Sequence, residues 1–235
     1  MIRAVLFDKD GTLIDFEKTW FAVARELALE AADGDEQAAR RMLDAGGYDF
    51  DAGRFRGGSV IAAGTNSDIV GLWYPGLEGE ARAVRIAEFD RRSAEAGARN
   101  AVEIEGAAQA LARLHAKGYA IGVATNDSTR GAELTVAALG FAPLMSAVLG
   151  YDIVTKPKPA ADPVLHFAEA TGIAPEAIAV VGDNAHDLEM ARAAGAGLAI
   201  GVLSGNSGRA ELEPLADFVL ASVAELPAFF EIDRA

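Results

Sequence analysis

The feature of the sequence that most constrains the fold is the apolar run Ala4–Phe7, followed directly by Asp8-Lys9-Asp10-Gly11. A short apolar run that ends at a glycine turn is typical of a strand buried on both faces of a parallel sheet. In such open sheets, ligands bind just beyond the carboxyl ends of the strands. We therefore expect Asp8 and Asp10 to face a binding crevice, where two neighbouring carboxylates need a cation or a shared proton. The alternative is a solvated strand end.

The rest of the chain predicts an α/β fold that is interrupted once. Beyond residue 97, helical and strand patterns alternate, which is typical of a doubly wound, mostly parallel sheet covered on both faces. Residues 16–97 show helical periodicity, a glycine-rich stretch and no convincing strand. We predict a sheet domain of residues 1–15 and 98–235, with an all-α cap domain of residues 16–97 inserted after the first strand. An insertion at that point would lie over the strand ends as a lid.

Composition excludes several classes of function. The formal net charge of −14 argues against binding to nucleic acid or to anionic membranes, both of which favour a basic surface. The absence of cysteine excludes disulfides, thiolate metal sites and cysteine nucleophiles. The first residues lack the pattern of a signal peptide, and no apolar stretch is long enough to span a bilayer. We expect a cytoplasmic protein that acts on a small molecule.

Polar residues follow three further predicted strands. Thr125 and Asn126 end the strand 119–125, two lysines follow the strand 146–150, and Asp183 follows the strand 177–181. Because the carboxyl ends of parallel strands meet at one edge of the sheet, we expect these groups to gather around Asp8 and Asp10. Magnesium in proteins is usually held by one or two carboxylates together with substrate phosphate oxygens. The pattern therefore indicates phosphoryl transfer.

These four motifs, in this order, resemble those of the haloacid dehalogenase superfamily, in particular its phosphoglycolate phosphatase-like branch with a helical cap inserted after the first motif. The resemblance covers nearly the whole predicted sheet domain. It implies that Asp8 attacks phosphorus, while Asp10 protonates the leaving alcohol and then activates water. It further implies that Thr125, with Asn126 behind it, binds the phosphate.

The resemblance also implies a Mg²⁺ cofactor. Its ligands would be Asp8, the backbone carbonyl of Asp10, and Asp183, with Asp187 as a further acid that binds directly or through water. An alternative for Asp187 is the role of an acid at a helix N-terminus, where it would complement the helix dipole.

The phosphate-binding lysine has two candidates. Lys158-Pro159-Ala160-Ala161-Asp162-Pro163 fits the family's spacing of Lys-Pro-x-Pro-Asp-Pro, with alanine where the second proline is common. Lys156 begins a second, shorter match. We assign the role to Lys158 and keep Lys156 as the alternative.

Two arginines in the glycine-rich part of the insertion are candidate substrate ligands. A guanidinium fork suits a second anionic group on a substrate, and Arg54 and Arg56 would supply it from the cap. The alternative is that both arginines are ordinary solvated surface residues.

We thus predict a Mg²⁺-dependent phosphatase that hydrolyses a small phosphomonoester through an aspartyl-phosphate, with phosphoglycolate as a candidate substrate by resemblance. A sugar-phosphate mutase would use the same core but would return the phosphoryl group to an intermediate. A haloacid dehalogenase lacks the second aspartate of the first motif and needs no metal, so Asp10 and Asp183 argue against it. A non-catalytic binding module would be expected to have lost Asp8 or Asp10.

Overall fold

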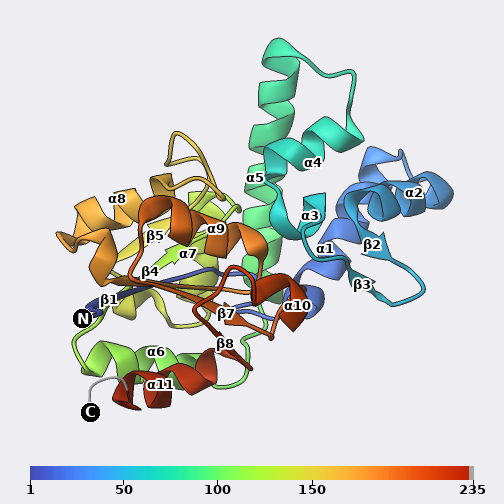
Figure 1. The fold of residues 1–235 in the computed structure, drawn as a ribbon. Coiled ribbons are helices and arrows are strands. Elements are labelled where there is room, and N and C mark those ends of the chain that lie inside the picture. The colour runs from blue at the N-terminus through green and yellow to red at the C-terminus, as the bar shows by residue number, and fades with distance from the viewer. Residues whose placement is uncertain (233–235) are drawn as a thin grey trace.

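A six-stranded parallel sheet forms the centre of the computed structural model, which describes residues 1–232 (Figure 1). Its strands, in the order in which they lie side by side, are β5 (Ala147–Leu149), β4 (Ala120–Ala124), β1 (Ala4–Phe7), β6 (Ile178–Gly182), β7 (Leu198–Val202) and β8 (Phe218–Leu220). All neighbouring pairs are parallel. The two central strands are β1 and β6, so the residues that follow them emerge in the middle of the sheet edge.

The strands are apolar throughout because helices cover both faces. In β1, Val5 and Phe7 belong to the hydrophobic cluster on one face, and Ala4 and Leu6 belong to the cluster on the other. The first face is covered by α6 (Ala107–Ala116), α7 (Thr129–Ala138) and α11 (Leu226–Ile232). The second face is covered by α8 (Asp162–Thr171), α9 (Ala185–Ala194) and the short α10 (Arg209–Leu212). The predicted α/β class with a doubly wound parallel sheet is confirmed.

Residues 16–100 form a separate group of elements, which we call the helical segment (Figure 1). It contains α1 (Phe16–Ala31), α2 (Glu36–Gly46), β2 (Tyr48–Asp49), β3 (Arg54–Phe55), α3 (Val60–Ala63), α4 (Asn66–Trp73) and α5 (Gly79–Asn100). These elements enclose their own hydrophobic cluster, which includes Phe55, Trp73 and Phe89. Helix α5 packs against α7 of the sheet domain. The helical segment thus has a core distinct from the two that flank the sheet.

The structure differs in detail from the sequence-based expectation. The helical segment is not wholly α-helical, because β2 and β3 form a short antiparallel pair in which Tyr48 faces Phe55. Two-residue strands show no alternation, so the sequence pattern could not reveal them. A 3₁₀ turn, η3 (Val223–Glu225), precedes the last helix, α11. Two more 3₁₀ turns, η1 (Ala142–Leu144) and η2 (Pro175–Ala177), lie in loops of the sheet domain.

The two connections between the sheet domain and the helical segment run side by side. The amide of Asp15 donates to the carbonyl of Val102 (2.7 Å), and the amide of Ile104 donates to the carbonyl of Leu13 (2.9 Å). Asp15 also caps α1, since its carboxylate accepts from the amide of Lys18 (3.1 Å). The chain therefore enters and leaves the helical segment at one place, next to the first acidic motif.

A polar contact far from these connections also joins the two parts. The hydroxyl of Tyr151, in the loop after β5, donates to Oδ2 of Asp90 on α5 (2.8 Å). The side-chain amide of Asn66 donates to the other oxygen of Asp90 (2.9 Å). Burial raises the pKa of Asp90, although these two hydrogen bonds lower it. Within residues 1–232, no helix has the length and apolar character needed to cross a bilayer.

This contact leads to a first prediction. Tyr151→Phe should lower the free energy of unfolding by about 1 kcal/mol, because half-buried Asp90 loses a hydrogen-bond donor. Urea denaturation measures the change. Tyr74→Phe is the matched control, because within the described residues the hydroxyl of Tyr74 makes no hydrogen bond while its ring packs on Phe89. An equal loss of unfolding free energy in the two variants would contradict a stabilising role of the hydrogen bond from Tyr151 to Asp90.

Candidate active site

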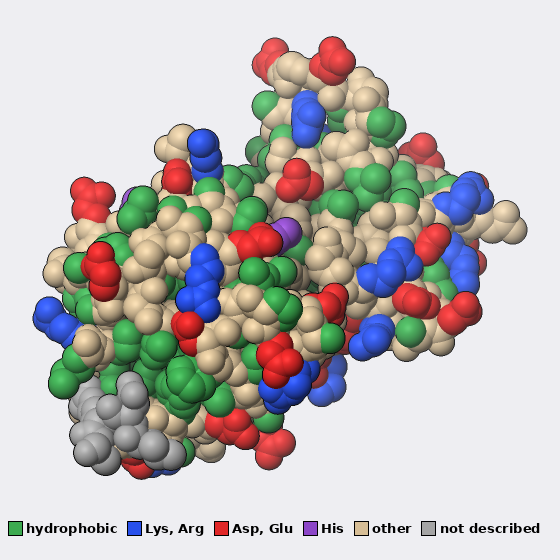
Figure 2. All heavy atoms as spheres, in the orientation of Figure 1, with side chains coloured by type: hydrophobic (Ala, Val, Ile, Leu, Met, Phe, Trp, Pro, Cys, Tyr) green, Lys and Arg blue, Asp and Glu red, His purple; other side chains and the backbone are tan. Residues whose placement is uncertain are grey.

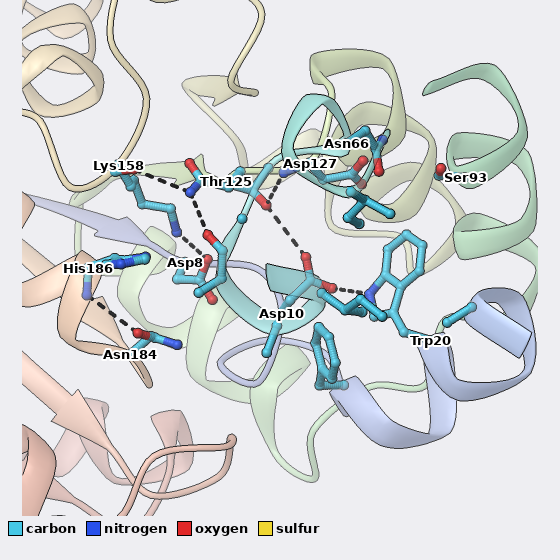
Figure 3. Close-up of a pocket in the computed structure, with 18 of the residues that line it drawn as sticks. Asp8, Asp10, Trp20, Asn66, Ser93, Thr125, Asp127, Lys158, Asn184 and His186 are labelled. Atoms are coloured by element: carbon cyan, nitrogen blue, oxygen red, sulfur yellow. Dashed lines mark hydrogen bonds and ion pairs between the residues drawn. The ribbon is translucent and has the colours of Figure 1, made fainter. Parts of the chain in front are cut away.

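A pocket opens at the carboxyl edge of the sheet, beneath the helical segment (Figure 3). The loops after β1, β4, β5 and β6 contribute Asp8, Asp10, Thr125, Lys158 and Asp183 to its lining. Gly11 makes this convergence possible. It has φ of 87°, and a Cβ there would lie 2.6 Å from a carboxylate oxygen of Asp183, so a side chain would be both strained and obstructed.

Three buried carboxylates face one buried ammonium group in the pocket. Asp8, Asp183 and Asp187 each offer an oxygen within 4.8 Å of the others. Nζ of Lys158 lies 2.5 Å from Oδ1 of Asp8 and 2.6 Å from Oδ1 of Asp187. With all groups ionised, three negative charges and one positive charge leave a formal charge of −2. A buried charge of this size needs compensation, and one divalent cation would supply it.

The pKa shifts follow from this crowding. Burial raises the pKa of Asp8 to about 7, although Lys158 lowers it. Burial also raises the pKa of Asp183 well above its ordinary value, and the charges of Asp8 and Asp187 raise it further. Burial alone would lower the pKa of Lys158, yet Asp187 and Asp8 raise it overall, so this lysine stays protonated. Burial and crowding thus favour a proton on these carboxyl groups, and a further positive charge in the site would favour their ionised form.

Asp187 has the helix-capping role that the sequence allowed, and its second carboxylate oxygen lies in the pocket, where its predicted metal contact stays a prediction. Its Oδ2 accepts from the amide of Asn184 (3.1 Å), which closes a capping box at the start of α9. Its Oδ1 accepts from Lys158 inside the pocket. The helix cap thus fixes the orientation of a carboxylate whose other oxygen is available to the site.

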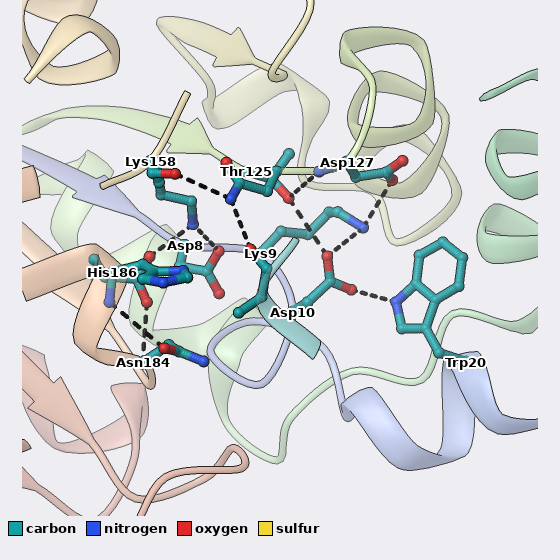
Figure 4. Close-up of polar contacts among 12 residues, drawn as sticks. Asp8, Lys9, Asp10, Trp20, Thr125, Asp127, Lys158, Asn184 and His186 are labelled. Atoms are coloured by element: carbon teal, nitrogen blue, oxygen red, sulfur yellow. Dashed lines mark hydrogen bonds and ion pairs between the residues drawn. The ribbon is translucent and has the colours of Figure 1, made fainter. Parts of the chain in front are cut away.

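Asp10 lies in a second polar network, on the side of the pocket nearest the helical segment (Figure 4). Its Oδ1 accepts a hydrogen bond from the indole Nε1 of Trp20 on α1. Its Oδ2 forms an ion pair with Nζ of Lys9 (2.8 Å) and lies 3.5 Å from the hydroxyl of Thr125. Lys9 is 1% exposed and pairs also with Asp127 (3.1 Å). Asp10 is therefore held by groups from both parts of the molecule.

Several residues of these networks had no predicted role. Lys9 is one, although a lysine between two acids at the end of a buried strand is a signal that could have been used. Asp127, the second ion-pair partner of Lys9, follows the predicted phosphate-binding Thr125 and Asn126. The backbone amide of Asn206 donates to Oδ2 of Asp183 (2.9 Å), a contact without any side-chain signal. Trp20 packs within the helical segment and also contacts Asp10.

The remaining predicted residues divide into those inside and those outside the pocket. Asn126 lines it, and its Nδ2 donates to the carbonyl of Ala63 in α3 (2.7 Å). Lys156 is exposed, so Lys158 is the lysine that the fold brings to the carboxylates.

Arg54 and Arg56 are also exposed and do not line the pocket. The guanidinium of Arg56 donates instead to the carbonyl of Asp44 (2.6 Å). Basic side chains around α2, β2 and β3 stand on the outer surface beside acidic ones (Figure 2). The predicted contact of the two arginines with substrate stays a prediction, and this arrangement gives it no support.

The chain is similar in sequence and in fold to known proteins. The family model for haloacid dehalogenase-like hydrolases matches residues 2–195. A phosphoglycolate phosphatase of Escherichia coli K12 is 33% identical over 199 residues, which cover 83% of this chain and 79% of the relative. An N-acetylmuramic acid 6-phosphate phosphatase of Pseudomonas aeruginosa is 31% identical with the same coverage. The crystal structure of a predicted phosphoglycolate phosphatase from Haemophilus somnus shares the fold, with a TM-score of 0.73, 21% identity, and coverage of 97% and 98% of the two chains.

The buried charges lead to a second prediction. Lys158→Met should lower the free energy of unfolding in metal-free buffer by about 3 kcal/mol, because it leaves buried carboxylates without a positive partner. Lys156→Met is the matched control, and it should change stability by less than about 0.5 kcal/mol because Lys156 is exposed. Chemical denaturation of both variants measures the difference. A Lys158→Met variant as stable as the wild type would contradict the assignment of Lys158 as the positive partner of the buried carboxylates.

Proposed function

The chain belongs to the haloacid dehalogenase-like hydrolase family, and from this premise we propose that it is a Mg²⁺-dependent phosphatase acting on a small phosphomonoester through an aspartyl-phosphate at Asp8. Two relatives are named as phosphatases of phosphoglycolate and of N-acetylmuramic acid 6-phosphate, so phosphoglycolate is one candidate substrate among several. The observation that carries the proposal is the buried group of Asp8, Asp183 and Asp187 facing Lys158.

The donor set of this group fits Mg²⁺. The ion prefers carboxylate oxygens and usually keeps positions for water and substrate phosphate. Asp8, Asp183 and Asp187 offer such oxygens within reach of one another, and their formal charge with Lys158 matches one divalent cation. The backbone carbonyl of Asp10 is a further candidate ligand. When bound, Mg²⁺ would neutralise part of the charge on the phosphoryl group as it approaches Asp8.

The residues of the pocket support a two-step reaction. A carboxylate oxygen of Asp8 attacks phosphorus, and the bond from phosphorus to the ester oxygen breaks as Asp10 protonates that oxygen. Asp10, now a carboxylate, takes a proton from water, whose oxygen attacks phosphorus, releases inorganic phosphate and restores Asp8. Lys158 and Thr125 lie where they would hold the phosphoryl oxygens, and Lys158 would offset their developing charge.

We assign residues 16–97 the role of a cap that closes over this reaction. The side-by-side connections near Asp15 and Val102 provide a hinge beside Asp10, and the contact from Trp20 to Asp10 forms when α1 lies over the pocket. Closure would shield Asp8 and the phosphoryl group from bulk water and would complete the environment of the general acid.

A phosphate-release assay tests the activity. Mg²⁺ should be required, and chelation should abolish turnover reversibly. Asp8→Asn should lower kcat by at least about 10³-fold with the fold retained, because the nucleophile is lost. Asp10→Asn should also lower kcat severely and should accumulate as phosphoenzyme, because hydrolysis of the aspartyl-phosphate loses its base. Asp51→Asn, an exposed site outside the pocket, is the control and should retain wild-type turnover. Undiminished turnover in Asp8→Asn would reject the mechanism.

The contact between Trp20 and Asp10 gives a further prediction. Trp20→Phe should lower kcat/KM for benzyl phosphate about fivefold, the effect of one hydrogen bond that positions the general acid. The value for p-nitrophenyl phosphate should change much less, because its leaving group departs without protonation. Asp10→Asn should likewise lower kcat/KM more for benzyl phosphate than for p-nitrophenyl phosphate, and by a larger factor. If kcat/KM falls equally for both esters, Trp20 acts only through packing and does not position the general acid.

A further inference from the structure

The part of the pocket beneath the helical segment is apolar. Helices α1, α3, α4 and α5 line it with side chains that include Val23, Leu27, Ile69, Trp73 and Phe89. The polar groups among them are largely occupied within the protein. The hydroxyl of Ser93 donates to the carbonyl of Phe89 (2.5 Å), and the N–H groups of Asn66 and Trp20 donate to Asp90 and Asp10. A ligand in this part of the pocket would therefore meet mainly hydrocarbon.

The basic side chains of the pocket lie elsewhere. Among described residues that line the pocket, the basic side chains are those of Lys158 and His186, and both belong to the sheet domain. Figure 3 shows them on the opposite side of Asp8 from Trp20. On the side of Trp20, Asp10 and Asp127 line the pocket, and the cation beside them is Lys9, which lies 5.0 Å from the centre of the Trp20 ring, is 1% exposed and pairs with both acids. A negative group on this side would face acids and hydrocarbon without a free cation.

The mechanism determines which part of a substrate would lie there. The phosphoryl group has to meet Asp8 and Lys158, and the ester oxygen has to face Asp10, which protonates it. Asp10 lies between Asp8 and Trp20 (Figures 3 and 4). The alcohol portion of the ester therefore extends past Asp10 towards the apolar wall formed by α1, α4 and α5.

We infer that the substrate is the phosphomonoester of an uncharged, predominantly apolar alcohol, and not of a carboxylated one. This inference rests on the proposed phosphatase function and narrows its substrate class. It departs from the phosphoglycolate named for the Escherichia coli relative, because the carboxylate of that compound would be placed against Asp10 and the hydrocarbon wall without a cationic partner. In a hydrophobic pocket, each additional methylene of a fitting substrate raises kcat/KM by roughly 10–200-fold.

The wild-type protein with Mg²⁺ tests the inference on three esters of primary alcohols. Benzyl phosphate is apolar and uncharged, glycerol 1-phosphate is polar and uncharged, and phosphoglycolate carries a carboxylate. We expect kcat/KM to fall in that order, with at least a tenfold difference between the first and the last. An equal or higher value for phosphoglycolate or glycerol 1-phosphate would overturn the inference while leaving the phosphatase function intact.

A pair of variants on one helix provides a sharper test. Ile69 lines the pocket and is half-buried, whereas Leu72 on the same helix is 37% exposed and lies outside the lining. Ile69→Arg places a cation in the apolar wall, so the ratio of kcat/KM for phosphoglycolate to that for benzyl phosphate should rise at least tenfold. Leu72→Arg should leave this ratio unchanged. An unchanged ratio in folded Ile69→Arg would show that the alcohol portion does not reach this wall.

A binding measurement separates the failure of the inference from the failure of the proposed function. Calorimetry with Asp8→Asn protein and Mg²⁺ should show tighter binding of benzyl phosphate than of phosphoglycolate. If no ester is hydrolysed by the wild type but this order holds, the phosphatase function is wrong and the apolar pocket is supported. If turnover occurs but phosphoglycolate binds as tightly as benzyl phosphate, the inference on substrate class is wrong.

Discussion

The arrangement of the site depends on one electrostatic constraint: buried carboxylates from separate loops meet where water cannot screen them. Asp8, Asp183 and Asp187 are each at most 6% exposed, and Lys158 contacts two of them. Such a cluster is costly to a fold unless cations offset it. The protein supplies one cation in Lys158 and, in the proposed function, leaves room for a divalent ion and for the phosphoryl group that the ion attracts. The buried cluster of carboxylates, which is unfavourable for stability, is thus the feature that suits the proposed chemistry.

A second charged network separates the two acids of the first motif. Asp8 pairs with Lys158, and Asp10 pairs with Lys9, which is shared with Asp127. Each carboxylate therefore has its own cation, and their environments differ although the residues are two positions apart. Asp10 also accepts from Trp20, so the helical segment contacts the residue to which we assign proton transfer. This gives the proposed cap a direct means of influencing the reaction.

The division of the pocket between its two parts suggests how a common fold can serve different substrates. The sheet domain provides the polar groups that bind and transfer phosphate, and the helical segment provides the surface met by the alcohol. In this chain that surface is largely hydrocarbon, and Arg54 and Arg56 lie outside it. A family match across residues 2–195 supports the shared chemistry but does not identify the alcohol. The side chains that line the pocket determine which alcohol fits.

Local patterns in the sequence determined much of the architecture by themselves. The buried strands, the alternation of helix and strand, and the break in that pattern between residues 16 and 97 all reflect interactions among near neighbours. The motif order led to Asp8, Asp10, Thr125, Lys158 and Asp183, which the fold brings to one pocket because parallel strands end at the same edge. The two-residue strands β2 and β3 escaped detection because they are too short to show a period.

Only the tertiary structure decided how residues distant in the chain pair with one another. It placed Lys158 instead of Lys156 among the carboxylates, gave Lys9 two acidic partners, and brought Trp20 to Asp10. It also turned Arg54 and Arg56 outwards and left an apolar wall over the site. These outcomes depend on the packing of the helical segment against the sheet domain. Periodicity reports which face of an element is buried, but it does not report what that face meets.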